Sequence, residues 1–105
     1  MYQIIHYLDE NENDLYQDWL DGLRDRVAKV AIIRRIARVE VGLFGDHKLL
    51  RDGVCELRID VGYRVYYARV ENRVILLTSG GEKKSQSRDI ERAIGLLADW
   101  EKRNG

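Results

Sequence analysis

The chain has 105 residues, of which 45% are hydrophobic and 34% are charged, and its 18 basic side chains balance 18 acidic ones. These values favour one folded domain over residues 1–105, exclude a disordered chain, and leave no apolar stretch near the roughly 20 residues of a membrane span. Because the N-terminus lacks a signal-peptide pattern and Cys55 is the single cysteine, we expect a cytoplasmic protein without disulfides.

The first predicted element is a strand over residues 2–7, which are rich in β-forming side chains. The polar segment 8–13 predicts a turn in which Asn11 or Asn13 caps the helix that follows. That helix is indicated by apolar residues at helical spacing, namely Leu15, Trp19, Leu20 and Leu23.

A second helix is predicted over residues 25–41, antiparallel to the first. Its apolar residues form a broad stripe that we expect to be buried: Val27, Val30, Ala31, Ile33, Ile36, Ala37 and Val41. Gly42 and Gly45 then interrupt the helical pattern, so residues 42–53 are predicted to form a loop.

The second half of the chain has the pattern of strands. Apolar and polar side chains alternate over residues 54–60, which predicts a half-buried strand, and a turn at 61–62 leads to a return strand over 63–70. Residues 73–78 are apolar on both faces, which is typical of a strand with neighbours on both sides. The glycine-rich segment 80–84 is predicted to be a flexible loop.

A last helix is predicted to begin after Ser85 or Ser87. Its apolar face has five members: Ile90, Ala93, Ile94, Leu97 and Trp100. The elements therefore follow in the order β-α-α-β-β-β-α. This order predicts an α+β fold in which a small, mainly antiparallel sheet is packed with two N-terminal helices and one C-terminal helix.

The charges are divided unevenly along the chain. Residues 1–25 hold seven acids and one base, so the remaining residues hold eleven acids and seventeen bases. Within the basic part, four side chains are predicted to share one face of the hairpin over 54–70: Glu56, Arg58, Arg64 and Tyr66. Such a hairpin brings facing side chains within about 5 Å. We expect Lys83 and Lys84 to close one rim of this face, and Lys48 and Arg51 the other.

This set of residues suits cleavage of an RNA phosphodiester bond. Glu56 can accept the proton of the attacking 2′-hydroxyl group, and Lys83 can protonate the leaving 5′-oxygen. Arg58 and Arg64 can stabilise the extra negative charge that develops on the phosphorus centre. We expect the RNA contacts to come from Lys48, Arg51, Tyr66 and Lys84, with Tyr66 stacked on an unpaired base.

The alternative is a solvated charged face in which Glu56 forms a salt bridge with Arg58 or Arg64. No group of Cys, His and Asp residues has the spacing of metal ligands, so we expect neither a metal nor another cofactor.

Four segments resemble the conserved blocks of small addiction-module killer proteins, the HigB-like branch of the RelE/ParE superfamily. They occur in the family's order and span nearly the whole chain: residues 19–25 (WLDGLRD), 53–59 (GVCELRI), 62–67 (GYRVYY) and 80–86 (GGEKKSQ), the last followed by Asp89, Ile90 and Ala93.

The resemblance implies the toxin of a type II toxin–antitoxin system. Such toxins cut messenger RNA, usually in the ribosomal A site, and so inhibit translation and growth. The implied partners are a cognate antitoxin, often a helix-turn-helix protein, and the ribosome with its message. Arg64 matches the key strand arginine of RelE-like members, and Lys83 or Lys84 matches a basic residue after the last strand. Glu56 and Arg58 occupy strand positions that are basic in the best-known members.

Two other functions remain open at this point. The chain can be a ParE-like inhibitor of DNA gyrase, or an inactive relative that only binds an antitoxin. ParE-like members share the fold but lack the basic face. The joint presence of Arg58, Arg64, Lys83 and Lys84 therefore favours a ribosome-dependent endoribonuclease.

Overall fold

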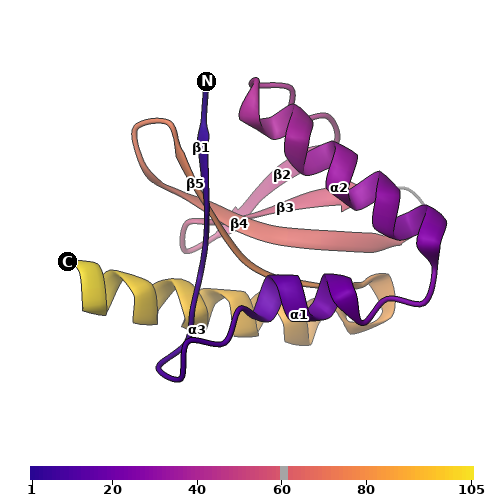
Figure 1. Cartoon of the computed structure of the whole chain (residues 1–105). Coiled ribbons are helices and arrows are strands. Elements are labelled where there is room, and N and C mark those ends of the chain that lie inside the picture. The colour runs from indigo at the N-terminus through magenta and orange to yellow at the C-terminus, as the bar shows by residue number, and fades with distance from the viewer. Residues whose placement is uncertain (60–61) are drawn as a thin grey trace.

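The computed structural model of the chain describes residues 1–59 and 62–105 (Figure 1). The elements are β1 (Gln3–His6), α1 (Leu15–Asp21), α2 (Arg26–Glu40), β2 (His47–Arg51), β3 (Val54–Ile59), β4 (Tyr63–Glu71), β5 (Val74–Glu82), a 3-10 turn η1 (Lys83–Ser85) and α3 (Gln86–Asn104). The α+β class and the three helices are as predicted, and the sheet has one strand more than expected. Residue 60 of the predicted strand and residue 61 of the predicted turn lie outside the described residues.

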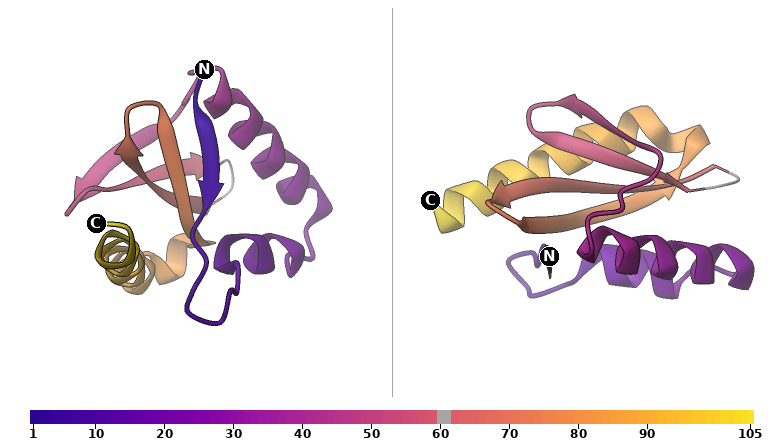
Figure 2. Two further views of the ribbon diagram at one scale, coloured as in Figure 1. Left: turned by 60° about the vertical axis from the view of Figure 1, so that its left-hand side comes forward. Right: turned by 90° about the horizontal axis from the view of Figure 1, so that it is seen from above.

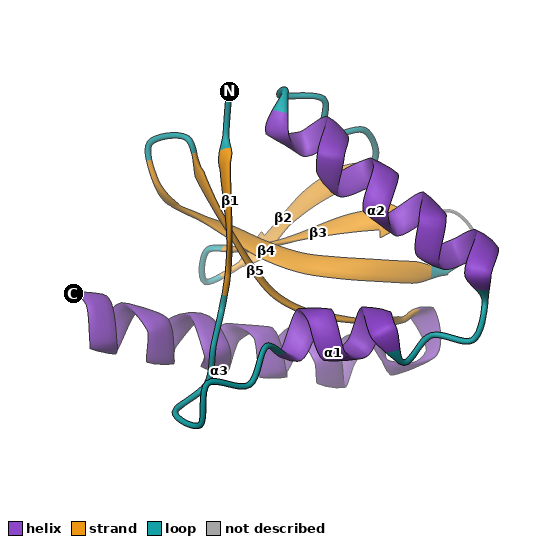
Figure 3. Cartoon of the chain, in the orientation of Figure 1, coloured by secondary structure: helices purple, strands orange, loops and turns teal. Residues whose placement is uncertain are grey.

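The five strands form one sheet in the order β1-β5-β4-β3-β2. Strand β1 runs parallel to β5, and every other neighbouring pair is antiparallel, so the sheet is mainly antiparallel as expected (Figure 3). Strand β5 lies between β1 and β4, which confirms that its two apolar faces belong to an interior strand.

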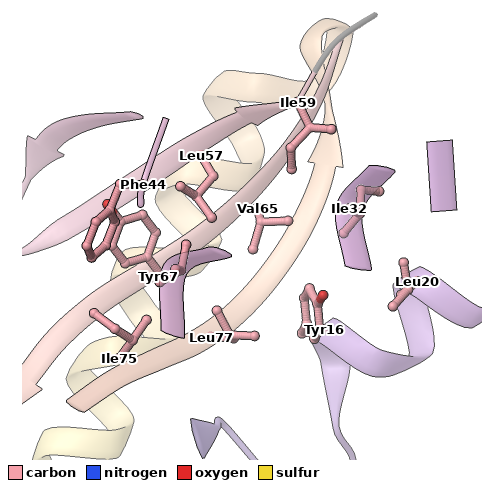
Figure 4. Packing of buried hydrophobic residues seen from close by; sticks show 11 residues of the cluster. Tyr16, Leu20, Ile32, Phe44, Leu57, Ile59, Val65, Tyr67, Ile75 and Leu77 are labelled. Carbon is pink, nitrogen blue, oxygen red and sulfur yellow. The ribbon is translucent and has the colours of Figure 1, made fainter. Parts of the chain in front are cut away.

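Helices cover both faces of this sheet. Helices α1 and α2 lie on one side and α3 lies on the other (Figure 2). Tyr16 and Leu20 of α1 and Ile32 of α2 point towards the sheet, where they meet a cluster of buried residues (Figure 4). The sheet contributes six residues to that cluster: Leu57, Ile59, Val65, Tyr67, Ile75 and Leu77. On the other side Ala93 and Leu97 of α3 pack with residues that point the opposite way, namely Val54, Tyr66, Ala68 and Leu76.

Aspartates begin the first two helices. The Asp14 carboxylate accepts a hydrogen bond from the Gln17 amide at 2.9 Å, and Asp25 accepts one from the Ala28 amide at 3.0 Å. The expected cap at Asn11 or Asn13 was wrong. The Asp9 carboxylate accepts hydrogen bonds from the backbone amides of both asparagines, which holds them in the preceding turn.

Helix α2 is one residue shorter at each end than predicted, and it buries a different face. Its buried residues are Ala28, Ile32 and Val39. Most of the predicted stripe is instead exposed: Val27, Val30, Ile33, Ala37 and Val41. The helix carries apolar side chains on two opposite sides, so periodicity alone identified an apolar face without identifying the one that meets the sheet.

Two segments predicted to be loops contain strand residues. Strand β2 lies at the sheet edge, and four of its five side chains are exposed, so it has no alternating pattern that the sequence could reveal. Strand β5 continues through Gly80 and Gly81, where the missing side chains make room for groups packed on both faces of the sheet.

Candidate anion-binding site

A hollow of about 600 Å³ lies where β3 ends, β4 begins and β5 passes into η1. Its lining is rich in cations and includes Asp46, Arg58, Gly62, Arg64, Glu82, Lys83 and Lys84. The strand register explains this meeting, because Arg58 faces Arg64 across β3 and β4, and Arg64 faces Gly81 across β4 and β5. Four cations therefore surround a space that two carboxylates border.

Glu56 lies below this hollow and has no exposed surface. Its Oε2 atom accepts a hydrogen bond from Arg58 Nε at 2.9 Å, and its Oε1 atom accepts one from Gln86 Nε2 at 3.0 Å. Oε1 also lies 3.6 Å from Arg64 Nε. One buried carboxylate thus lies between two guanidinium groups, and the α3 glutamine satisfies its remaining oxygen. The salt bridge expected in the alternative sequence interpretation is present to both arginines.

Arg64 lies almost buried beside the Glu56 carboxylate. Its side chain is 11% exposed, and its buried Nε atom has no hydrogen-bond partner among the described residues. Arg58 is more open to solvent, and its NH1 atom lies 3.9 Å from the Asp46 carboxylate. The bonds to Glu56 raise the pKa of Arg58, so this guanidinium stays charged. Two fixed positive groups therefore point towards the hollow with donors to offer an anion.

Helix α2 supports the site through Arg35. This guanidinium donates hydrogen bonds to three backbone carbonyls, those of Arg58 at 2.7 Å and of Phe44 and Asp46 at 2.9 Å. Burial lowers the pKa of Arg35, and the Asp46 carboxylate opposes that shift. The contacts fasten the segment before β2 to the end of β3, which fixes Asp46 beside Arg58.

The β5 glycines allow side chains to approach the strand closely. A Cβ atom at Gly81 would lie 2.0 Å from Asp89 Oδ2, and one at Gly80 would lie 2.2 Å from the Trp19 ring. Asp89 in turn accepts a hydrogen bond from Ser85 Oγ at 2.5 Å. The Lys83 amide donates to the Gly62 carbonyl at 2.7 Å. These contacts fix the turn that carries Lys83 and Lys84 at the rim of the hollow.

The structure brings four predicted site residues together around the hollow: Arg58, Arg64, Lys83 and Lys84. Glu56 lies beneath them, as described above. Lys48 faces Glu56 across β2 and β3 but lies outside the residues that line the hollow. Arg51 is also elsewhere, since it pairs with Asp52 and with Glu91 of α3.

The expected stacking role of Tyr66 was wrong. Its side chain has no exposed surface, because α3 covers this part of the sheet, so no ring face is available to a base. Burial, with the nearby Glu56 and Asp89 carboxylates, raises the pKa of Tyr66 to about 12. Its hydroxyl group is buried without a hydrogen-bond partner among the described residues.

Three residues that shape this region are absent from the predicted site: Asp46, Gln86 and Asp89. Asp46 lies in the segment predicted to be a loop, with no pattern that connects it to Arg58. Gln86 and Asp89 come shortly after Lys83 and Lys84 in the chain, and this closeness in sequence was the available sign that they belong to the site. Their partners Glu56 and Gly81 lie on other elements, so only the folded chain shows the contacts.

Within residues 1–59 and 62–105, no group of three or more His, Cys, Asp or Glu side chains is placed to hold a metal ion. Over the same residues, no helix is both long enough and apolar enough to cross a membrane.

The fold and this site define a class of protein, a small α+β protein with a cation-rich hollow at one corner of its sheet. An uncharacterized protein of Haemophilus influenzae (strain Rd) is 42% identical to the chain over 80 residues, which cover 74% of this chain and 81% of that protein. The chain belongs to the same family as that protein. A scan against profiles of known protein families finds no match.

Proposed function

We propose that the chain is a toxin of the RelE/ParE superfamily that cleaves messenger RNA on the ribosome and so stops growth. One observation carries the proposal. Arg58, Arg64, Lys83 and Lys84 surround a single hollow, and the two arginines are anchored there by a buried carboxylate. The superfamily assignment comes from the sequence resemblance, and the hollow supplies its chemical rationale.

An RNA phosphodiester is the anion that best suits this arrangement. Its phosphate is negative before the reaction and becomes more negative as the 2′-oxygen attacks. Guanidinium groups held in advance stabilise that added charge without reorganising during the reaction. The planar guanidinium of Arg64 also offers paired donors to two phosphate oxygens. The terminal nitrogens of Arg58 and Arg64 are assigned to the scissile phosphate.

The reaction forms a bond from the 2′-oxygen to phosphorus and breaks the bond from phosphorus to the 5′-oxygen. It leaves a 2′,3′-cyclic phosphate on one fragment and a 5′-hydroxyl on the other. Lys83, at the rim of the hollow, is assigned to protonate the 5′-oxygen. Asp46 replaces Glu56 as the proposed base, because its carboxylate is exposed and borders the hollow. Glu56 instead positions the two arginines.

The ribosome is the proposed source of substrate alignment. The hollow is open and its aromatic neighbour Tyr66 is buried, so the protein offers few contacts that would order a free RNA strand. A message held in the ribosomal A site arrives already positioned. The proposal includes action in the cytoplasm and neutralisation by a cognate antitoxin, as the resemblance implies.

Induced expression in a bacterial host tests this function. The wild type is expected to stop growth and to generate new 5′ ends inside translated codons, mapped by primer extension on a reporter message. Arg64→Ala is expected to abolish both effects. Arg92→Ala removes an exposed arginine of α3 outside the hollow and serves as the matched control, expected to behave as wild type.

Two results would overturn the proposal. Growth arrest with intact messages and accumulating DNA damage would favour a ParE-like gyrase inhibitor. Unimpaired growth, with the wild-type protein shown by immunoblot to accumulate, would favour an inactive relative that only binds an antitoxin.

A further inference from the structure

The outward side of α2 is an apolar face on a charged helix. Val27 is 81% exposed, Ile33 is 51% exposed and Val41 is 55% exposed, although side chains of this kind are usually buried in a folded chain. Val30 and Ala37 are exposed on the same side. The helix already packs on the sheet through Ala28, Ile32 and Val39, so the outward residues contribute nothing to the core.

The exposed residues lie at a spacing that suits another helix. Val27, Val30, Arg34, Ala37 and Val41 are separated alternately by three and four positions, which is the spacing of a helix–helix seam. The 15 residues of α2 give a seam of about 22 Å at 1.5 Å per residue. Near its N-terminal end, a hollow of about 390 Å³ is lined by Arg26, Val27, Val30, Ala31 and Arg34. An apolar side chain can enter this hollow between two guanidinium groups.

The charges of α2 indicate what kind of helix fits. The helix has one acidic residue, Glu40, against four basic ones that are not bonded to the sheet side: Arg26, Lys29, Arg34 and Arg38. The fifth, Arg35, is occupied by backbone carbonyls beside the sheet. Arg34 lies in the middle of the seam. If α2 paired with α2 of a second copy about this seam, parallel or antiparallel, Arg34 would face its own counterpart. Like charges in contact oppose such pairing, whereas a carboxylate opposite Arg34 favours it.

We propose that the outward face of α2 binds an acidic amphipathic helix of a partner protein. Apolar side chains of that helix cover Val27 and Val30, and a carboxylate pairs with Arg34. This surface is separate from the hollow that contains Arg58 and Arg64, so the proposal does not depend on the assigned activity.

Binding of a defined peptide tests this surface with the full chain. The probe is a fluorescent helical peptide of about 22 residues with leucine at the two seam positions of each heptad and glutamate at the flanking positions and opposite Arg34. Its glutamates also oppose pairing of the peptide with itself. A peptide with lysine in place of each glutamate is the matched control. Fluorescence anisotropy measures both affinities, and sedimentation velocity measures self-association.

The acidic peptide is expected to bind at least about tenfold more tightly than the lysine peptide, and Arg34→Glu is expected to reverse that preference. The double variant Val27→Ser/Val30→Ser is expected to weaken binding about tenfold. Leu49→Ser alters an exposed apolar residue of β2 and is expected to bind as wild type does. The residues changed in these variants are exposed, and thermal unfolding is measured for every variant to show that it is folded.

The proposal fails if neither peptide binds, if both bind equally, or if Arg34→Glu leaves the preference unchanged. It also fails if the wild type sediments as a dimer that Val27→Ser/Val30→Ser dissociates, since a second copy would then occupy the face. Arg64→Ala is expected to leave peptide binding unchanged. That result separates this surface from the proposed nuclease site.

Discussion

Glu56 is the residue on which the geometry of the site depends. Its carboxylate compensates Arg64, which is nearly buried, and hydrogen-bonds Arg58 and Gln86. Glu56→Ala is expected to lower the free energy of unfolding by about 3 kcal/mol, because Arg64 would lose its counter-charge in a poorly solvated place. Urea denaturation measures this change. Glu82→Ala, which removes an exposed carboxylate at the rim, is the control and should stay within about 0.5 kcal/mol. A similarly small effect of Glu56→Ala would contradict the anchoring role.

Tyr66 provides a second test at the scale of a single side chain. Its hydroxyl is buried without a partner among the described residues, so Tyr66→Phe is expected to leave stability unchanged or to raise it by up to about 1 kcal/mol. Growth arrest should persist, because the ring contacts no RNA in this account. A Tyr66→Phe protein that is folded but has lost its activity would contradict the burial argument.

Tyr66 is also expected to make the free energy of unfolding depend on pH. Burial raises the pKa of Tyr66 from 10.0 to about 12, so folding favours the neutral phenol. The resulting stabilisation is fully present below pH 10 and is lost as pH rises towards 12. Free energies of unfolding measured between pH 9 and pH 12 should therefore fall less steeply for Tyr66→Phe than for the wild type. The pKa of Tyr16 is also raised to about 12, so part of the decrease in the free energy of unfolding with pH remains in both proteins.

Strand β5 contains glycine where side chains of α1 and α3 pack directly against its backbone. Gly80→Ala would place a methyl group against the Trp19 ring, an aromatic group that cannot move aside without disturbing α1. The expected cost is about 2 kcal/mol in the free energy of unfolding, measured by urea denaturation. Gly95 is the matched control, because a Cβ atom there meets nothing within 4 Å on α3. Gly95→Ala is expected to stabilise the protein by about 0.5–1 kcal/mol. Equal effects of the two substitutions would contradict this packing argument.

The elements also show what the sequence could predict about the fold. Periodicity was sufficient to locate α2, α3 and the interior strands, and in α3 and the strands the predicted apolar face contacts the core. It failed for β2, since an edge strand held mainly by backbone hydrogen bonds needs no apolar alternation. It also misjudged which side of α2 is buried, because both sides carry valine, isoleucine or alanine.

For the site, the alternation in β3 and β4 correctly placed Arg58 and Arg64 on one face. That α3 covers part of this same face could not be predicted, because an apolar stripe on a helix is compatible with either side of the sheet. Burial of Glu56 and Tyr66 follows from that placement. Gln86 reaches Glu56 across 30 positions of the chain, a contact that no local pattern predicts.

The net charge of zero conceals a local concentration of cations on the protein. The first 25 residues carry a charge of −6 and the remaining residues carry +6. All four cations of the hollow belong to the basic part, on β3, β4 and η1. This separation gives the protein one region that attracts a polyanion while the molecule stays neutral. Association with RNA on the ribosome should accordingly weaken as salt concentration rises.

The proposed reaction is cleavage of messenger RNA on the ribosome at the hollow around Arg64. The most direct measurement incubates the purified protein with ribosomes translating a defined message and maps the fragment ends. We expect cuts inside codons only when ribosomes are present, fragments with 5′-hydroxyl ends, and no cuts by Arg64→Ala. A message that stays intact with the wild-type protein, or that Arg64→Ala cuts equally well, would contradict it.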